Sequence, residues 1–249
     1  MELADRAAIV TGGTGGLGIA TARTLAKAGA DVCITFKNNK DAAWSICEEI
    51  SSYGRRGVAV ELDQSNSDSV DEATAHATQE LGGIDILVNN AAAARPVPFS
   101  DLKALTPDIW DDLMSINLRG PFLVSRAAAP FLRKSDGGRI VNVGAMIGLK
   151  PAGSSIAKAV SKAGVLHLTR CLAVALAPDV TVNCVAPGVM EKMTATPGLN
   201  EGYVEGFRKM SILHKTTSIE DVASQIVEFC KAETVTGQVL VLDGGIHFH

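Results

Sequence analysis

Short apolar runs alternate with longer amphipathic stretches along the whole chain. The apolar runs are made almost entirely of Val, Ile, Leu, Ala and Cys, and they lack the strict apolar–polar alternation of a half-exposed strand. Strands of a parallel sheet that is covered by helices on both faces have this composition. The pattern predicts strands at Ala7–Thr11, Asp31–Phe36, Gly57–Leu62, Ile84–Asn89, Arg139–Val143, Thr181–Val185 and Gln238–Leu242.

The stretches between these strands have the spacing of helices, and several begin with a start signal. The alternation of strand and helix predicts right-handed crossovers and a doubly wound α/β sheet with helices on both faces. No linker and no internal repeat divides the chain, so we expect one domain over residues 1–249. The start signals are Asp41, Ser67, Thr106 with Pro107, and Ser218. The predicted helices cover residues 16–26, 41–53, 67–81, 106–134, 154–177 and 218–231.

Residues 189–217 break this alternation, because they contain a proline and three glycines and have only weak periodicity. The segment follows a predicted strand, on the side where doubly wound sheets bind their ligands. We therefore expect a mobile substrate lid at 189–217. A long surface loop is the alternative that has the same length.

Composition narrows the class of protein. With 47% hydrophobic and 20% charged residues, the chain has ample material for a packed core. A net charge of -4 without a Lys- or Arg-rich run argues against nucleic acid as a partner. We expect a cytoplasmic protein without membrane contact, since no leader and no apolar run near the roughly 18 residues of a membrane span is visible. Five scattered cysteines indicate reduced thiols rather than disulfides or a metal site.

A glycine-rich turn joins the first predicted strand to the first predicted helix. It reads Thr11-Gly12-Gly13-Thr14-Gly15-Gly16-Leu17-Gly18. Glycines let the backbone turn tightly and approach a pyrophosphate, and the helix start provides free N–H groups and the positive end of the helix dipole. In this strand–turn–helix setting the turn predicts a dinucleotide site rather than an ordinary Gly-rich turn.

The end of the second predicted strand favours the phosphorylated form of the cofactor. Sites for NAD usually have Asp or Glu here, which binds the ribose 2′-hydroxyl. This chain instead continues after Phe36 with Lys37, Asn38, Asn39 and Lys40. A cation attracts a 2′-phosphate that a carboxylate would repel, so we expect NADPH rather than NADH. The alternative is that both lysines are solvated charges at the start of a helix.

These motifs and several later ones together resemble the short-chain dehydrogenases/reductases, over essentially the whole chain. The resemblance implies a single Rossmann-type domain with a seven-stranded parallel sheet, an NAD(P)H-dependent reaction on a small molecule, and a homo-oligomer, either a dimer or a tetramer. The matching residues are Thr11-Gly12-x-x-x-Gly16-x-Gly18, Asp63, Asn89-Asn90-Ala91, Asn117, Lys162, Pro187-Gly188, Thr236-Gly237-Gln238 and Asp243-Gly244-Gly245.

The resemblance also implies roles for individual residues. Lys162 would hold the hydroxyls of the nicotinamide ribose, Asn117 would support a water-linked proton path, and Val189 would offer its backbone to the carboxamide. The cofactor-binding residues are accordingly predicted as Thr11, Gly12, Thr14, Gly16, Leu17, Gly18, Lys37, Asn38, Asp63, Gln64, Asn90, Ala91, Lys162, Pro187, Gly188 and Val189.

The chain departs from the family at the catalytic centre. Family members use a Ser that steadies the substrate oxygen and a Tyr, four residues before the Lys, that exchanges a proton with it. Here Lys158 occupies the Tyr position and Ala145 occupies the Ser position. Neither Tyr53, which closes an early helix, nor Tyr203, which lies in the predicted lid, is in register to replace the phenol. The ordinary carbonyl-reducing centre is therefore expected to be altered.

Lys158 and Lys162 lie one helical turn apart, so each positive charge opposes the other. Partial burial would lower the pKa of Lys158 from its usual value of roughly 10.4, as in lysines used for acid–base or Schiff-base chemistry. An exposed or salt-bridged, idle Lys158 is the alternative. We predict Lys158, Lys162 and Asn117 as the catalytic residues.

The substrate is expected to contact a second set of residues. Ser154 or Ser155 would supply a displaced hydroxyl, unless both only cap the helix. Arg95 would hold an anionic group, unless it is an ordinary surface residue. The predicted substrate-binding residues are Ala145, Met146, Ser155, Arg95 and Met190.

Three functions remain as alternatives. The first is an NADPH-dependent reductase whose substrate is an imine, iminium or carbinolamine, because hydride addition to C=N⁺ gives a neutral amine without a proton donor; in a variant of it, the Lys158 ammonium is the acid for a carbonyl. The second is a non-redox lyase in which Lys158 is the nucleophile. The third is a catalytically silent NADP(H)-binding protein. The reductase is favoured because the cofactor-binding residues persist through the nicotinamide ribose.

Overall fold

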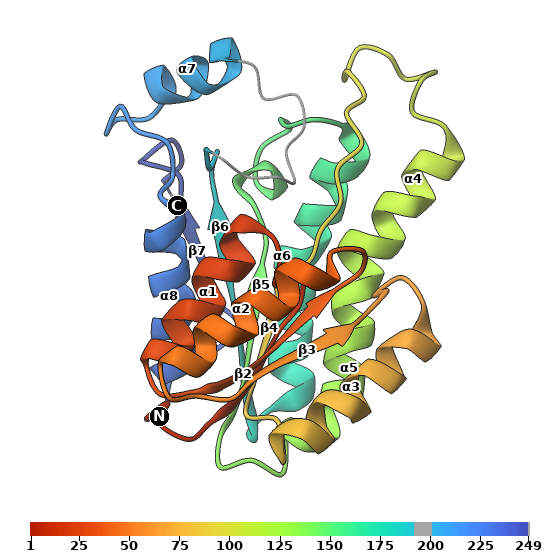
Figure 1. Cartoon of the computed structure of the whole chain (residues 1–249). Helices are drawn as coiled ribbons and strands as arrows, with labels where there is room; N and C mark the ends of the chain where they lie inside the picture. The colour runs from red at the N-terminus through yellow and green to blue at the C-terminus, as the bar shows by residue number, and fades with distance from the viewer. Residues whose placement is uncertain (192–200, 249) are drawn as a thin grey trace.

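A computed structural model describes residues 1–191 and 201–248 of the chain. Seven parallel strands form one sheet in the spatial order β3-β2-β1-β4-β5-β6-β7 (Figure 1). The chain reverses its direction of travel between β1 and β4, which is where doubly wound sheets open a ligand crevice. The predicted sheet is confirmed. Its strands are β1 Ala7–Val10, β2 Asp31–Phe36, β3 Gly57–Glu61, β4 Ile86–Asn89, β5 Gly138–Val143, β6 Val180–Pro187 and β7 Val239–Leu242.

Helices cover both faces of the sheet (Figure 1). Helices α1, α2 and α8 pack on one face, and α3, α5 and α6 pack on the other. Within β1, Ala8 and Val10 join the first layer while Ala7 and Ile9 join the second, so the strand is buried on both sides. The helices are α1 Gly16–Lys27, α2 Lys40–Ser52, α3 Ser67–Leu81, α4 Pro107–Met114, α5 Gly120–Leu132, α6 Ile156–Leu176, α7 Glu201–Met210 and α8 Ile219–Lys231.

The helix predicted over 106–134 is confirmed in its extent, but it is not regular throughout. The structure has α4, then a π-helical turn at Ser115–Arg119, then α5. Pro121 carries no N–H group for the carbonyl four residues before it, so the regular hydrogen-bond ladder fails at this point. One carbonyl of this π-helical turn, that of Ile116, is bound by the side chain of Gln64, whose Nε2 donates at 2.8 Å.

Two of the predicted helix starts are correct and two are shifted. Thr106 caps α4 and Ser218 caps α8, as predicted. The cap of α2 is Asn39 rather than Asp41, and the cap of α3 is Asn66 rather than Ser67. An Asn side chain accepts from the first-turn N–H groups as well as Ser or Asp does, so the sequence offered two neighbouring candidates at each site.

The predicted lid at 189–217 contains helix α7, which the sequence did not predict. Only Phe207 of this helix is buried. Its apolar residues Tyr203, Val204, Phe207 and Met210 do have helical spacing, but the glycines and the proline of the segment favoured a loop in the sequence. The lid is anchored at its far end, where the backbone N–H of Thr217 donates to the Val189 carbonyl at 2.9 Å. Residues 192–200 of the lid lie outside the described residues, and its mobility stays a prediction.

Helix α6 is long and apolar enough to cross a membrane by length and composition, which corrects the expectation that the chain has no such run. Half of its most apolar window is nevertheless buried inside the protein, against β5, β6 and α4. This is the position of a core helix in a doubly wound domain. Its N-terminal turns carry Lys158 and Lys162, and Lys162 reaches the carboxyl end of β5 at Val143.

Candidate active site

A cavity of about 780 Å³ opens along the carboxyl ends of the central strands. Its wall takes residues from the glycine-rich turn, from the ends of β2 to β6, from the start of α6 and from α7. Most of the residues predicted from the sequence meet in this one wall. They are Gly12, Thr14, Leu17, Gly18, Lys37, Asn38, Asp63, Gln64, Asn90, Ala91, Arg95, Ala145, Met146, Lys158, Lys162, Pro187, Gly188, Val189 and Met190.

The glycine-rich turn forms a tight cradle at one end of the cavity. Gly12 has φ +62°, and a Cβ there would lie 2.8 Å from the Cα of Ala91. A Cβ on Gly18 would lie 2.3 Å from the carbonyl oxygen of Gly12. The N-cap of α1, Gly15, has no side-chain hydrogen bond, which leaves first-turn N–H groups available to an anion. The cradle therefore fits a dinucleotide pyrophosphate, which only glycine allows to approach so closely.

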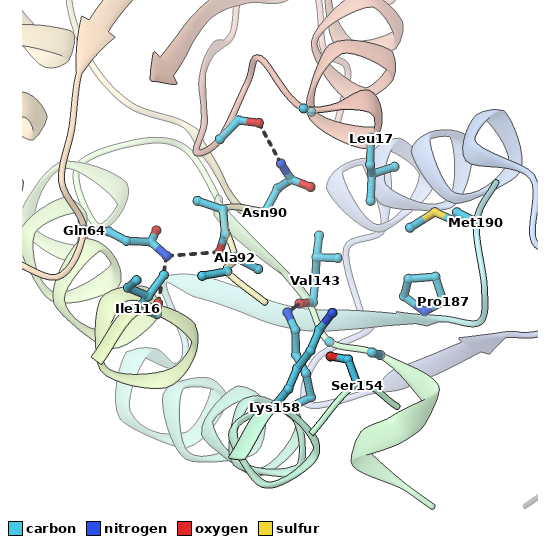
Figure 2. A pocket seen from close by; sticks show the side chains of 18 of the residues that line it. Leu17, Gln64, Asn90, Ala92, Ile116, Val143, Ser154, Lys158, Pro187 and Met190 are labelled. Carbon is cyan, nitrogen blue, oxygen red and sulfur yellow. Dashed lines mark hydrogen bonds between the residues drawn. The ribbon is translucent and has the colours of Figure 1, made fainter. Parts of the chain in front are cut away.

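Thr11 and Asn90 hold this cradle to the end of β4. The Thr11 hydroxyl accepts from the backbone N–H groups of Asn90 and Ala91, both at 3.0 Å. The Asn90 amide donates to the carbonyls of Thr11 and Gly12 at 2.9 and 3.0 Å (Figure 2). Thr11 is fully buried and lies outside the cavity wall, as does Gly16, so both shape the predicted cofactor site from behind it.

An ion pair closes the far end of the cavity, where β2 and β3 end. Lys37 Nζ lies 2.6 Å from Asp63 Oδ2. Burial raises the pKa of Asp63, but hydrogen bonds from Lys37 and Ser65 outweigh this effect and bring the pKa below its usual value. Asp63 is the only carboxylate among the described residues of the wall. Lys37 thus lies at the end of β2, which is the place where the sequence predicts that a 2′-phosphate binds.

Gln64, which follows Asp63, joins three segments beneath the cavity. Its Nε2 donates to the carbonyls of Ala91 and Ile116 at 3.0 and 2.8 Å (Figure 2). Its Oε1 is buried and has no hydrogen-bond partner among the described residues. A buried amide oxygen without a partner is uncommon in folded proteins, and here it belongs to the wall of a large cavity.

Lys162 is buried in the floor of the cavity, with 5% of its surface exposed. Its ammonium donates to the Val143 carbonyl at 2.7 Å (Figure 2). Burial lowers the pKa of Lys162 from 10.5 to about 8, with a further lowering by the charge of Lys158, while Cys184 acts in the opposite direction. A buried cation that donates one hydrogen bond retains two donors for a ligand in the cavity.

Lys158 lies one turn earlier on α6, and its side chain extends beside Val143 and Ser154 (Figure 2). Burial lowers the pKa of Lys158 below its ordinary value. Its ammonium makes no hydrogen bond or ion pair with any of the described residues. Within residues 1–191 and 201–248, Lys158 is therefore neither fully exposed nor held in a salt bridge, which were the two alternatives.

Asn117 and Ser155 lie outside the wall. The Asn117 side chain accepts from the Ala93 N–H at 2.8 Å and donates to the Ala93 carbonyl at 3.1 Å. It therefore fixes the segment that follows β4. Ser155 is fully buried, and its hydroxyl accepts from the Lys158 N–H at 3.3 Å as the cap of α6. The structure uses both side chains to position the site.

The substrate end of the wall contains residues that were not in the predicted set. Ile147 follows the predicted Met146 in a 3-10 turn. Ser154, which was considered only as an alternative to Ser155, directly precedes that residue before α6, so nearness in sequence was the available signal for both. Tyr203 reaches the wall from α7, and only the position of that helix reveals it. Arg95 lines the wall and also pairs with Asp112, at 3.3 Å between Nη2 and Oδ2. No group of three His, Cys, Asp or Glu side chains in the described ranges is placed to hold a metal ion.

The chain is similar in sequence and in fold to known proteins. A family model described as Enoyl-(Acyl carrier protein) reductase matches residues 12–247. A relative from Streptomyces violaceoruber, named for the granaticin polyketide synthase, is 37% identical and covers 96% of this chain and 95% of its own. The 3-oxoacyl-[acyl-carrier-protein] reductase FabG of Aquifex aeolicus is 34% identical over 99% of both chains. The crystal structure of a short chain dehydrogenase from Burkholderia cenocepacia in complex with NADP superposes with a TM-score of 0.91, at 32% identity over 99% of both chains.

Proposed function

Because the chain belongs to the short-chain dehydrogenase/reductase family and is an NAD(P)H-dependent oxidoreductase, we propose that it is an NADPH-dependent reductase of C=N substrates. The substrate class is an imine, iminium or carbinolamine rather than a simple ketone. One observation carries this proposal: the cavity wall holds the amine of Lys158 one helical turn before the buried Lys162, with Ala145 in place of a hydroxyl.

The wall supplies a complete set of groups for the cofactor. The glycine cradle and the start of α1 would hold the pyrophosphate, and Lys162 would hold the nicotinamide ribose as in the family. Lys37 would pair with the 2′-phosphate, which favours NADPH over NADH. When bound, the reduced cofactor supplies a hydride, and thus two electrons, to the substrate carbon.

Proton transfer then distinguishes a C=N substrate from a ketone. Lys158 lacks a carboxylate partner in the described chain, and burial lowers its pKa. It is therefore a stronger acid than an ordinary lysine. An imine nitrogen is far more basic than a ketone oxygen, so an ammonium can protonate it before reduction. The nitrogen gains one proton from Lys158, the carbon gains the hydride, and the neutral Lys158 amine regains a proton from water. For a carbinolamine, the same proton leaves with the hydroxyl group as water.

A non-redox lyase is the second candidate, and it rests on the same amine. A neutral, partly buried lysine is a nucleophile that forms Schiff bases with carbonyl substrates. The two functions differ in the form of Lys158 that they need. The reductase uses the ammonium, whereas the lyase uses the neutral amine and leaves NADPH unconsumed.

NADPH consumption with matched substrates tests the proposal. We expect turnover of 2-methyl-1-pyrroline and much slower turnover of cyclopentanone. Replacement of Lys158 with Met should lower kcat/KM by about 100-fold or more, as for loss of a general acid. Lys158→Arg keeps the charge but not the acidity and should be almost as slow. Lys150→Met is the matched control, because Lys150 is exposed and outside the wall.

Other outcomes separate the alternatives. Faster reduction of cyclopentanone than of the pyrroline contradicts the C=N substrate and favours Lys158 as the acid for a carbonyl. Borohydride trapping of a carbonyl substrate on Lys158, without NADPH consumption, favours the lyase. Tight NADPH binding without turnover of any substrate, unaffected by Lys158→Met, favours a silent binding protein.

We also propose that the protein is a homo-oligomer. A surface groove between α4, α5 and α6 is lined by Met114, Leu118, Phe122 and Leu168, and Phe122 is exposed. Apolar side chains gathered on a helical face are suited to a second copy of the chain. Light scattering of the purified protein tests this, and replacing Phe122 with Asp should shift it toward a smaller species.

A further inference from the structure

A second polar group in the cavity wall is Ser154, one of the two serines that the sequence offered as a displaced hydroxyl. Ser154 lines the wall, and its hydroxyl is directed toward the Lys158 side chain (Figure 2). The Oγ atom is buried and has no hydrogen-bond partner among the described residues. A buried hydroxyl without a partner is unfavourable, and the natural completion in a ligand cavity is a polar atom of the ligand.

The backbone around Ser154 holds this hydroxyl in place. The Val97 N–H donates to the Ser154 carbonyl at 2.8 Å, which ties the loop to the segment after β4. Gly153, just before it, has φ +103°, a conformation that favours glycine. Ser155, just after it, is committed to capping α6. The loop thus fixes Ser154 on both sides and leaves only its side chain free for the cavity.

Ser155 and Ser154 divide two tasks that sequence alone could not separate. Ser155 is fully buried and accepts from the Lys158 N–H, so its hydroxyl is already used. Ser154 has the complementary arrangement, with its carbonyl used and its hydroxyl unused. Of the two serines, only Ser154 has a hydroxyl left for a molecule in the cavity.

We infer that Ser154 is a substrate-binding residue whose hydroxyl, together with the Lys158 amine, holds the reacting nitrogen or the carbinolamine hydroxyl of the substrate. This inference rests on the proposed reductase function. Ala145 leaves the end of β5 without a hydroxyl, and Ser154 supplies one from the loop before α6 instead. A hydroxyl is both donor and acceptor, so it binds the imine lone pair, the carbinolamine O–H and the product N–H.

Steady-state kinetics with 2-methyl-1-pyrroline test this role. Ser154→Ala should lower kcat/KM on the order of 10- to 100-fold, as expected for loss of one hydrogen bond to the reacting group. The affinity for NADPH should stay unchanged. The matched control is Ser135→Ala, because the Ser135 hydroxyl is also buried without a partner but lies outside the cavity wall. Adding Ala145→Ser to Ser154→Ala should restore part of the activity by returning a hydroxyl to the same cavity.

The outcomes of the inference and of the proposed function are distinguishable. If Lys158→Met abolishes turnover while Ser154→Ala stays within twofold of wild type, the Ser154 role is overturned and the reductase stands. If wild type reduces neither probe, the proposed function fails. The role of Ser154 is then tested by the binding of a product analogue to wild type and to Ser154→Ala. Calorimetry with 2-methylpyrrolidine and NADP-loaded protein should show roughly tenfold weaker binding to Ser154→Ala. Equal binding, or no binding to wild type, overturns it.

Discussion

The charge of Lys158 lowers the pKa of Lys162 from one helical turn away, within the wall of the same cavity. Burial alone already disfavours the Lys162 ammonium, and a second cation beside it adds to that effect. The one carboxylate of the described wall, Asp63, is bound to Lys37 at the opposite end of the cavity. Two amines with lowered pKa values therefore share the substrate end of the cavity, as expected of a functional site.

Restoring the family's residues should change the substrate preference. The double variant with Ala145→Ser and Lys158→Tyr places a hydroxyl and a phenol in the cavity beside Lys162. We expect cyclopentanone reduction to rise at least tenfold over wild type, since a general acid typically contributes about 100-fold or more, while 2-methyl-1-pyrroline reduction falls. Initial rates of NADPH consumption measure both. A double variant that keeps the wild-type preference would show that Lys158 does not select the substrate.

Lys162 should make stability rise with pH. Its folded pKa of about 8 lies below the ordinary value of 10.5. Between these values the unfolded chain binds more protons than the folded chain, so the free energy of unfolding increases with pH. The Lys162→Met variant lacks this contribution. The stability of wild type relative to the variant should therefore grow between about pH 8 and 10.5, by on the order of 3 kcal/mol. Urea unfolding at several pH values measures this difference, and a flat difference would contradict the burial of a charged Lys162.

Lys37 should set the preference for the phosphorylated cofactor. Replacing it with Ala removes the cation at the end of β2, and we expect NADPH to bind roughly tenfold more weakly while NADH changes little. Fluorescence titration of both cofactors measures this. Lys40→Ala is the matched control, because Lys40 starts α2 but lies outside the cavity wall. Equal weakening of both cofactors would mean that Lys37 acts only by holding Asp63.

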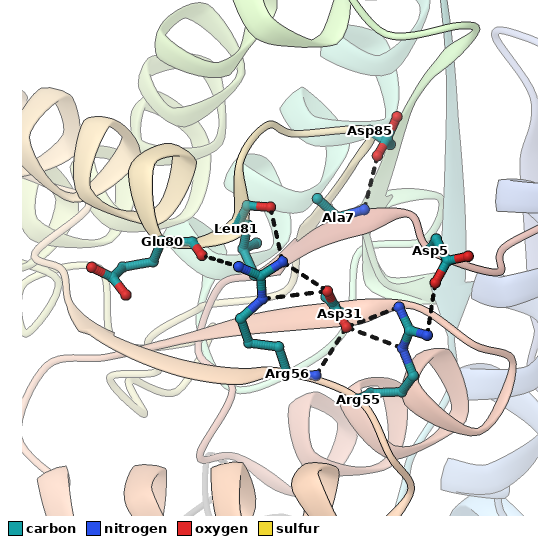
Figure 3. Close-up of polar contacts among 8 residues, drawn as sticks. All are labelled: Asp5, Ala7, Asp31, Arg55, Arg56, Glu80, Leu81 and Asp85. Carbon is teal, nitrogen blue, oxygen red and sulfur yellow. Dashed lines mark hydrogen bonds and ion pairs between the residues drawn. The ribbon is translucent and has the colours of Figure 1, made fainter.

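A cluster at the end of the sheet far from the cavity should act on stability alone. Asp31, at the start of β2, accepts from the Arg56 backbone at 2.9 Å and from the side chains of Arg55 and Arg56 (Figure 3). Arg56 also donates to the carbonyls of Glu80 and Leu81, which end α3. The cluster thus ties together β2, the start of β3 and α3.

Asp31→Asn should destabilise the fold by about 1–3 kcal/mol without changing kcat/KM, because it weakens charge-assisted hydrogen bonds of a mostly buried carboxylate. Burial raises the pKa of Asp31, but the hydrogen bonds from Arg56 and the charge of Arg55 have a larger opposite effect. The pKa of Asp31 therefore lies below its ordinary value of 3.8. Asp31 therefore stabilises the fold above pH 3.8, and this stabilisation is lost as the pH falls through the lower pKa of the folded state. Thermal melts against the exposed Lys231→Met variant provide the comparison. A change in kcat/KM would contradict the separation of this cluster from the site.

The sequence predicted the sheet well because its strands are buried on both faces and their apolar runs stand out. It also predicted that Lys158 and Lys162 lie on the same side of one helix, since that follows from a spacing of four. It placed Ser155 rather than Ser154 among the substrate-binding residues, whereas Ser154 lines the cavity, because both serines are compatible with a helix start. The place of Tyr203 in the wall was also missed, because the glycines and the proline of residues 189–217 favoured a loop although Tyr203, Val204, Phe207 and Met210 have helical spacing.

Tyr203 provides the check on the identity of the proton donor. It is the one phenol in the described wall, and burial raises its pKa. If Lys158 is the donor, Tyr203→Phe should keep kcat/KM for 2-methyl-1-pyrroline within a few-fold of wild type. A loss of kcat/KM as large as that of Lys158→Met would instead identify Tyr203, in the predicted lid, as the proton donor.

The pH dependence of kcat/KM for imine reduction tests the role of Lys158 most directly. After correction for the titration of the substrate itself, kcat/KM should fall with rising pH as the two coupled lysines lose their protons. This fall should occur below pH 10.5, the ordinary pKa of a lysine. In Lys158→Met the remaining activity should be at least about 100-fold lower, and its alkaline limb should lie at higher pH, because Lys162 has lost its cationic neighbour. A value of kcat/KM that rises with pH in wild type, or a limb that does not move in Lys158→Met, would contradict proton donation by Lys158.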